Sequence, residues 1–284
     1  MPDARTPVAL TIAGSDSGGG AGIQADLKAF ARCGVHGTSA ITAITAQNTL
    51  GVSEIHPVPA AIILAQVRAV CADIAPDAVK VGMLGSADAA GAVADALDEL
   101  PPETPVVVDP VMVAESGARL LDAGAERVLV ERIAPRASVL TPNLPEARAL
   151  LGRRAAAGGE QREVAEAEEL ARALLALGPG AVVVTGGHRA QAVDVFLTAG
   201  AEHAIEIAGE RHPDGAAHGS GCTHSSLLAA HLALGLDPLS AARAARALAG
   251  EAVRDGLRDV GAGAGPVDVL GLARIRAERA GAHG

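Results

Sequence analysis

An apolar run, Val8-Ala9-Leu10-Thr11-Ile12-Ala13, leads directly into the glycine-rich segment Gly14-Ser15-Asp16-Ser17-Gly18-Gly19-Gly20-Ala21-Gly22, and this pairing sets the architecture of the chain. The apolar run predicts a buried strand, and the glycines predict a loop. A helical pattern follows, with one apolar face formed by Ile23, Leu27, Phe30 and Ala31. A strand, loop and helix in this order are typical of an α/β protein.

The same alternation continues along the chain. Further strands are expected near residues 39–46, 78–83, 106–109, 138–140, 181–185, 193–197 and 203–207, and helices over 60–74, 88–100, 123–133 and 163–177 and from Thr223, Pro238 and Val267. Such alternation requires right-handed crossovers and a mostly parallel sheet with helices on both faces. No linker-like segment divides the chain, so we predict an α/β fold with one domain over residues 1–284.

The composition indicates a cytoplasmic protein. Hydrophobic residues make up 49% of the chain, but no apolar run is long enough for a membrane span, and the N-terminus lacks a basic-then-apolar signal. The three cysteines are Cys33, Cys71 and Cys222. Their odd number and wide spacing argue against a disulfide framework or a structural zinc site, and they suit a reducing compartment.

The charge and the scarcity of aromatic residues limit the possible partners. The formal net charge is −10, and Lys28 and Lys80 are the two lysines, so nucleic acid is not an expected partner. An acidic protein that binds phosphates must hold them locally, through backbone N–H groups and a metal ion. With two Phe and no Trp or Tyr, a flat ring substrate must pack on aliphatic side chains, methionine or peptide planes.

Polar and glycine-rich segments follow the predicted strands. In open parallel sheets, ligands bind at the carboxyl ends of the strands. The segments that fall there are Gly14 to Gly22, Gln47-Asn48, Met83, Asp109-Pro110-Val111, Thr141-Pro142-Asn143 and Thr185-Gly186-Gly187. These segments are therefore the candidates for a binding site.

A second glycine-rich turn, His218-Gly219-Ser220-Gly221-Cys222-Thr223-His224, precedes the helical pattern of Ser226 to Leu236. A bare helix start leaves its first N–H groups available, and with the helix dipole they form an anion site that suits a phosphoryl group in transfer. A helix N-terminus also lowers a thiol pKa, so Cys222 could act as a base toward a substrate hydroxyl. The alternative is a small core cysteine behind a turn.

The other candidates have structural alternatives when each is taken alone. Asp109 is a magnesium ligand or a cap beside Pro110, and Asn143 with Glu146 is equally a helix start. Asp26 either supports the helix dipole or faces the crevice. The amides of Gln47 and Asn48 suit a heterocycle edge or a turn, whereas His188 and His218 are better explained as surface or loop histidines.

Two nucleotide-binding motifs are excluded or weak. No G-x-x-x-x-G-K-[ST] loop occurs. The segment Gly20-Ala21-Gly22-Ile23-Gln24-Ala25 matches G-x-G-x-x-A after a strand, but the window from Ala40 to Thr45 lacks the acidic residue that a dinucleotide fold needs for the ribose. A dehydrogenase is therefore a distant alternative.

Taken together, six segments in order resemble hydroxymethylpyrimidine/phosphomethylpyrimidine kinases, which belong to the ribokinase-like superfamily. The segments are Ala13 to Lys28, Thr45 to Thr49, Lys80 to Leu84, Val108 to Met112, Leu140 to Ala147 and His218 to Thr223. They span most of the chain, and their combination is far more specific than any one of them.

The resemblance implies a three-layer α/β/α sandwich with a central, mostly parallel sheet. It implies phosphorylation of 4-amino-5-hydroxymethyl-2-methylpyrimidine and of its monophosphate in thiamine biosynthesis, with ATP and Mg2+ as cofactors, a monovalent cation as an open possibility, and a homodimer. By position, the pyrimidine would contact Gly14, Asp26, Gln47, Met83 and Val111, and the anion hole would be Gly219, Ser220, Gly221 and the base Cys222. The metal would lie at Asp109 and Glu146, and the nucleotide at Asn143, Thr185, Gly187 and His218.

Two departures from the family pattern concern charge. Thr185 stands where a phosphate-contacting lysine is common, so an arginine or the metal must compensate, or turnover is slow. Glu115 and Ala118 replace a lysine and an aspartate that are common in that loop. The alternatives are a pyridoxal or pyridoxine kinase, which shares the glycine-cysteine turn, and a non-catalytic pyrimidine-binding protein on the same fold.

Overall fold

The protein is described by a computed structural model that covers residues 5–113, 120–154, 160–186, 192–213 and 215–281. Its strands are β1 (Val8–Asp16), β2 (His36–Asn48), β3 (Gly51–Pro57), β4 (Ala78–Val81), β5 (Val106–Val108), β6 (Val139–Leu140), β7 (Ala181–Val184), β8 (Ala192–Thr198) and β9 (Ile205–Gly209). In the described residues they form one nine-stranded sheet in the order β3-β2-β1-β4-β5-β6-β7-β8-β9. Strands β2, β1, β4, β5, β6 and β7 are parallel neighbours, and β3, β8 and β9 are antiparallel additions at the two edges.

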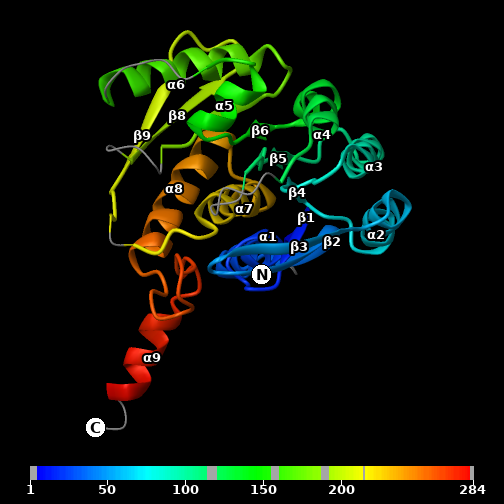
Figure 1. The fold of residues 1–284 in the computed structure, drawn as a ribbon. Helices are drawn as coiled ribbons and strands as arrows, with labels where there is room; N and C mark the ends of the chain where they lie inside the picture. Colours follow the sequence, from blue (N-terminus) through cyan, green and yellow to red (C-terminus); the bar gives the residue numbers. More distant parts are fainter. Residues whose placement is uncertain (1–4, 114–119, 155–159, 187–191, 214, 282–284) are drawn as a thin grey trace.

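Helices cover both faces of the sheet (Figure 1). They are α1 (Gly22–Arg32), α2 (Ala60–Asp73), α3 (Ala87–Asp98), α4 (Ala123–Val128), α5 (Leu144–Leu150), α6 (Glu160–Leu175), α7 (Ser220–Ala233), α8 (Pro238–Arg254) and α9 (Leu272–Gly281). A π-turn (Leu129–Ile133) and a 3-10 turn (Ala134–Arg136) extend α4. None of the helices in the described part of the chain is both long and apolar enough to cross a membrane. The predicted α/β/α class is confirmed.

The alternation of side chains along the strands separates two cores. Leu10 and Ile12 of β1 face the core beneath α2, α3, α5 and α6. Ala9 faces the opposite core, beneath α1, α7 and α8. Because successive residues of a strand point to opposite faces, Thr11 lies on the side of α1 and α7. The same rule places Lys80 of β4 on that side, and the site develops from this placement.

The start of α7 has no side-chain cap, as is also true of α1 and α2. Side chains of Ser86, Asn143 and Asp237 cap α3, α5 and α8 by accepting backbone N–H groups of the first turn. Helix α7 has Gly219 at this position, with φ of 80°, and no side-chain cap. No side chain therefore occupies the N–H groups of its first turn.

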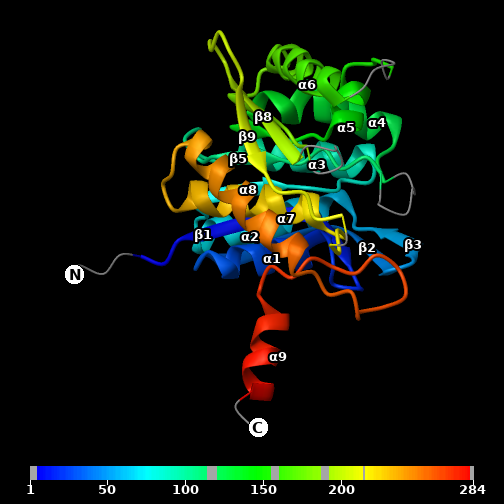
Figure 2. The same ribbon diagram turned by 90° about the vertical axis from the view of Figure 1, so that its left-hand side faces the viewer.

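The sequence prediction of elements was wrong in four places: β3 and α5 were not expected, α7 begins at Ser220 and not at Thr223, and the last helix begins later than expected. Strand β3 was not expected, because it is a mostly exposed edge strand whose residues carry no clear apolar alternation. The last helix was expected from Val267 but begins at Leu272. The Asp268 carboxylate accepts the N–H groups of Leu272 and Ala273, both at 2.8 Å, and so fixes the later start. Helix α9 then extends away from the body of the protein (Figure 2).

Candidate active site

The site lies where the strand order reverses. Strand β1 pairs with β2 on one side and with β4 on the other, so the chain first adds strands on one side of β1 and then crosses through α2 to the other side. Such a switch point leaves a crevice at the carboxyl ends of the strands. Helix α7 contacts α1, β1, β4 and β5. Its bare N-terminus therefore comes from a distant part of the sequence to the predicted crevice.

The carboxylate of Asp16 organises the glycine-rich loop after β1. It accepts N–H groups from Gly18, Gly20 and Ala21 at 2.8, 3.0 and 2.8 Å. Its Oδ2 also lies 3.1 Å from Nε2 of His218. Burial acts to raise the pKa of Asp16, but these hydrogen bonds and the charge of His218 outweigh it and lower the pKa. Asp16 thus stays ionised and links the glycine-rich loop to His218, the residue directly before Gly219 of the anion turn.

The predicted anion turn is closely packed against this loop. A Cβ at Gly219 would clash with the backbone carbonyl of Gly20, and the positive φ of Gly219 also disfavours a side chain. The N–H of Ser220 is used within the turn, because it donates to the carbonyl of Ala217 at 2.9 Å. Gly221 and Cys222 are the next two helical residues, and their N–H groups have no acceptor earlier in the helix. These two amides are the donors best placed for an anion.

Cys222 lies at the end of this turn and is partly buried. Burial raises the pKa of its thiol to about 12, and the nearby Lys80 cation only partly offsets that rise. A lowered thiol pKa was predicted from the helix N-terminus, and the direction of that prediction was wrong. Burial removes water from the thiolate, and the charges of Asp109 and Asp26 add to the rise in pKa.

The buried carboxyl group of Asp109 and the half-buried carboxyl group of Glu146 lie close enough for their charges to interact. Asp109 Oδ2 accepts the Ser225 hydroxyl of α7 at 2.9 Å. Glu146 accepts the N–H of Asn143 at 2.9 Å within the capping box of α5. Burial raises the pKa of both groups; the Asp109 charge raises that of Glu146 further, to about 8, while Lys80 and Ser225 act to lower that of Asp109. Because the two carboxyl groups repel each other when both are ionised, a bound cation would stabilise their charged forms.

The donor set fits magnesium better than a protein-enclosed metal. In the described residues, no three His, Cys, Asp or Glu side chains gather as a ligand cluster. Magnesium is commonly held by one or two carboxylates with waters and substrate phosphates as the remaining ligands. Asp109 and Glu146 supply that number of carboxylates.

Asp26 does not line the cavity described below but lies fully buried beneath α7. Its oxygens accept Lys80 Nζ at 2.9 and 3.0 Å, the Thr11 hydroxyl at 2.6 Å and the Ser226 hydroxyl at 2.6 Å. Both charged side chains have an exposed fraction of 0%. Lys80 was not predicted as a site residue, although a lone lysine in the apolar run of β4 is a signal of such a pair.

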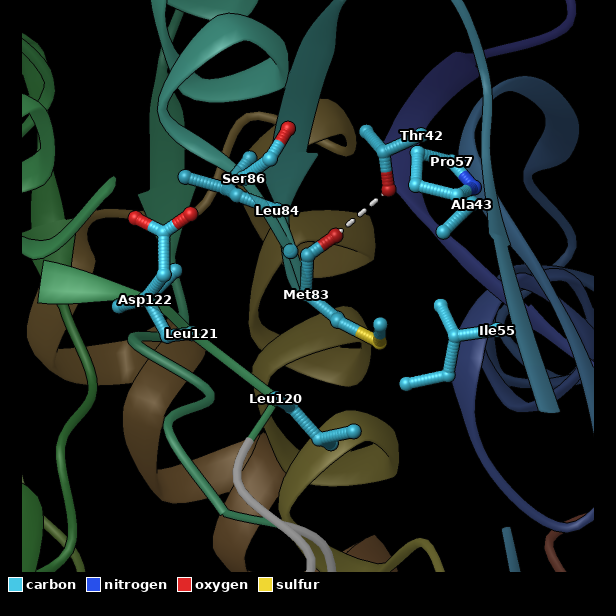
Figure 3. A pocket seen from close by; sticks show the side chains of 11 residues that line it. Thr42, Ala43, Ile55, Pro57, Met83, Leu84, Ser86, Leu120, Leu121 and Asp122 are labelled. Carbon is cyan, nitrogen blue, oxygen red and sulfur yellow. Dashed lines mark hydrogen bonds between the residues drawn. The ribbon is translucent and has the colours of Figure 1, made fainter. Parts of the chain in front are cut away.

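A cavity of about 310 Å³ opens beside Met83. Figure 3 shows the thioether of Met83 pointing into it between Ile55 of β3 and Leu120, and the Thr42 hydroxyl donating to the Met83 carbonyl at 2.7 Å. Gly14 lies behind the methionine, because a Cβ at this glycine would stand 3.0 Å from the Met83 sulfur. Of the predicted pyrimidine contacts, Met83 lines this cavity, whereas Gly14, Gln47 and Val111 are not among its lining residues.

The predicted nucleotide residues lie at the ends of β6 and β7. Asn143 and Thr185 are bridged across these strands, and the Thr185 N–H donates to the Pro142 carbonyl at 2.9 Å. The Asn143 side chain caps α5 by accepting the Glu146 N–H at 2.9 Å. His218 lies apart from this pair, beside Asp16. Gly187, and with it His188, Glu115 and Ala118, lies outside the described residues.

A buried ionic cluster behind the nucleotide side was not predicted. Asp194 of β8 accepts the Gly186 N–H at 2.8 Å, and its other oxygen lies 3.2 Å from His224 of α7. Burial acts to raise the pKa of Asp194, but His224 and Arg246 outweigh it and lower the pKa. The cluster joins the end of β7 to helix α7. His224, the last residue of the segment His218 to His224, was the sequence signal from which this cluster could have been predicted.

The sheet order, the anion turn at the carboxyl ends of the strands and the paired carboxyl groups define a ribokinase-like small-molecule kinase. The family model for phosphomethylpyrimidine kinase matches residues 16–268. The chain belongs to this family.

Individual relatives agree. A hydroxymethylpyrimidine/phosphomethylpyrimidine kinase of Synechococcus elongatus is 44% identical over 264 residues, which is 92% of this chain and 96% of that protein. The protein of the same name from Rhizobium meliloti is 46% identical over 265 residues, again 92% and 96%. Among solved structures, phosphomethylpyrimidine kinase from Clostridium difficile has a TM-score of 0.73 at 38% identity, covering 85% of this chain and 96% of that one. An ADP complex of Bacillus subtilis pyridoxal kinase has a TM-score of 0.83 at 36% identity, covering 94% and 99%.

Proposed function

We propose that the protein transfers the terminal phosphoryl group of ATP to the hydroxyl of 4-amino-5-hydroxymethyl-2-methylpyrimidine, and then phosphorylates the monophosphate to the diphosphate, in thiamine biosynthesis. The observation that carries the proposal is the anion turn of α7, which lies at the carboxyl ends of the strands together with the Asp109–Glu146 pair. The named activity of the relatives supports the substrate. Phosphoryl transfer needs mainly positioning and charge stabilisation, which the anion turn and the carboxylate pair would supply.

The pyrimidine would bind at the switch point. Met83 offers its flank to the ring, and Gly14 lets the ring approach the backbone closely. Gln47, from the end of β2, would bond the ring edge, and Val111 would close the other side. Asp26 would support the pocket indirectly, because its ion pair with Lys80 and its hydrogen bond to Ser226 hold α7 against β1 and β4.

The nucleotide would lie on the side of β6 and β7. Asn143, Thr185 and Gly187 would approach its phosphates, His218 would hold the glycine-rich loop beside them, and the Gly221 and Cys222 amides would receive the transferring group. Asp109 and Glu146 would hold Mg2+. When bound, that ion neutralises phosphate charge. We also propose a homodimer, on the family resemblance, and a cytoplasmic location, which the three free thiols suit.

An ADP-release assay with three acceptors tests the function. We expect ADP release with the pyrimidine alcohol and with its monophosphate, and loss of release when magnesium is chelated. With pyridoxal as acceptor, we expect kcat/KM to be lower by about 100-fold, because a site built for one ring loses several contacts with another. No ADP release with either pyrimidine, together with tight pyrimidine binding by calorimetry, would establish a non-catalytic binding protein.

A pyridoxal kinase is the second candidate. The observation that favours it is the similarity to the Bacillus subtilis pyridoxal kinase over 94% of this chain. Use of the pyrimidine monophosphate separates the two, because pyridoxal phosphate is not an acceptor in this chemistry. A higher kcat/KM for pyridoxal than for the pyrimidine alcohol, with no use of the monophosphate, would replace the first proposal by the second.

The two phosphorylation steps should respond differently to Cys222→Ala. The alcohol step needs a base, whereas the monophosphate is already ionised. Because the thiol pKa is raised to about 12, the thiolate fraction grows about tenfold per pH unit in the neutral range. We expect kcat/KM for the alcohol to rise from pH 7 to pH 9 in the parent and to stay flat in Cys222→Ala. The monophosphate should give the same profile in both proteins. An equal fall on both substrates at every pH would mean that Cys222 only lines the anion hole.

A further inference from the structure

A third glycine-rich segment, residues 260–267, lies between α8 and α9 and has no role in the site as described so far. We call it the C-terminal glycine loop. It contains Gly261, Gly263 and Gly265. In Figure 2 it is part of the orange-red loop that passes beside the ends of β2 and β3. Strands β2 and β3 pair as an antiparallel hairpin with its turn at Thr49 and Leu50. The C-terminal glycine loop thus reaches this hairpin from the other end of the sequence.

One side of the loop packs on the turn between β2 and β3. The Gly263 N–H donates to the Thr49 hydroxyl at 3.2 Å. A Cβ at Gly263 would clash with the Thr49 carbonyl and stand 3.2 Å from the Leu50 nitrogen, and a Cβ at Gly261 would clash with the Thr49 side chain. The φ of Gly263 is not in the left-handed region, so the close approach, and not backbone conformation, requires glycine there.

The other side of the loop is paired with the residue before the anion turn. The His218 N–H donates to the Gly265 carbonyl, and the Val267 N–H donates to the His218 carbonyl, both at 3.2 Å. These bonds form a short parallel bridge between His218 and Pro266. The loop therefore links the β2–β3 turn with the anion turn.

The hairpin has a second anchor next to this one. The Ser17 hydroxyl donates to the Gln47 carbonyl, and the Gln47 N–H donates to the same hydroxyl, both at 2.8 Å. The tip of the hairpin is largely exposed, and Leu50 at its turn is 68% exposed. Strand β2 is paired with β1 as far as Thr45. The contacts of Ser17 and Gly263 therefore hold the tip that lies beyond this pairing.

We propose that the C-terminal glycine loop positions the β2–β3 turn relative to the anion turn, with Gly263 as the positioning residue. The end of β2 carries Gln47, the residue proposed to bond the ring edge, so the loop sets where this amide meets the pyrimidine. This role for substrate rests on the proposed function. The positioning of the hairpin itself does not.

The test uses Gly263→Ala in the full chain. Its Cβ would meet backbone atoms of the Thr49 turn, so the turn must move. Gly250→Ala is the matched control, because its Cβ, on α8, would meet no atom within 4 Å. A second pair avoids a steric change: Thr49→Val removes the hydroxyl that accepts the Gly263 N–H, and Thr49→Ser keeps it.

Two readouts decide the proposal. In Gly263→Ala, amide hydrogen exchange of residues 46–52, measured without ligands, should be about tenfold faster, and KM for the pyrimidine alcohol should rise about tenfold with kcat and KM for ATP nearly unchanged. Thr49→Val should show the same changes more weakly, and Thr49→Ser should restore the parent values. Unchanged exchange of residues 46–52 in Gly263→Ala, or an equal change in Gly250→Ala, overturns the proposal. If the parent releases no ADP with the pyrimidine alcohol, the proposed function has failed, and the exchange result still decides the positioning of the hairpin.

Discussion

Replacement of Gly219 by alanine is expected to lower kcat by about 100- to 1,000-fold on both pyrimidine substrates, which is the loss caused by removing an oxyanion-hole donor. Gly219 has a φ of 80° and no room for a Cβ beside the Gly20 carbonyl. The substitution must therefore move the turn, and the Gly221 and Cys222 amides move with it. ADP release under saturating substrates measures the effect.

Gly221→Ala is the comparison that isolates the cause. A Cβ at Gly221 would meet no atom within 4 Å, and the N–H is retained. We expect a loss of less than about tenfold in this variant. The proposed anion hole would be refuted by a Gly219→Ala enzyme that keeps activity within tenfold of the parent. Circular dichroism of both variants shows whether the fold is retained.

Replacement of Lys80 by methionine is expected to destabilise the protein by about 3–5 kcal/mol, the range found when one partner of a buried ion pair is removed. Lys80 is fully buried, and its Nζ donates to both oxygens of Asp26. Without this cation, the Asp26 carboxylate is left charged and buried beneath α7. The pKa of Lys80 is raised because the attraction of Asp26 outweighs burial, so the Lys80 ammonium group is charged at neutral pH. Urea unfolding followed by circular dichroism measures the loss, because the chain has no Trp for fluorescence.

Two further variants test the assignment of this loss to the ion pair. The double variant Lys80→Met with Asp26→Asn should be more stable than Lys80→Met alone, because it removes the uncompensated charge and keeps an acceptor for Ser226. Lys28→Met replaces the second lysine, whose Nζ donates to the Gly19 carbonyl at 2.7 Å, and should cost less than about 1.5 kcal/mol. Equal losses in Lys80→Met and Lys28→Met would contradict this account.

The fold could be predicted from the sequence because each central strand is a short apolar run followed by a helical pattern. Strand β3 lacked that signal, since its side chains are mostly exposed and its partner β2 supplies the pairing. The end of the last loop also escaped prediction, because the Asp268 cap is a local contact that the apolar pattern does not show.

The positions of Asp109 and Met83 just after β5 and β4 were predictable, because a strand end alone determines them. The site was not predictable where two distant segments meet. Asp26 looked like a crevice residue because its helix follows the glycine-rich loop, but Lys80, 54 residues away, draws it into the core. The pKa of Cys222 depends on burial by several segments, and the contact of Thr49 with Gly263 spans 214 residues.

The two lysines decide how the protein can be attached to a surface. Lys80 is 0% exposed, so amine-reactive reagents will meet Lys28 as the accessible lysine ammonium group. That group holds the Gly19 carbonyl, and coupling of a biosensor surface to Lys28 would therefore tether the protein beside its glycine-rich loop. A handle on α9, which projects from the opposite end of the chain, would leave the loop free for binding measurements (Figure 1).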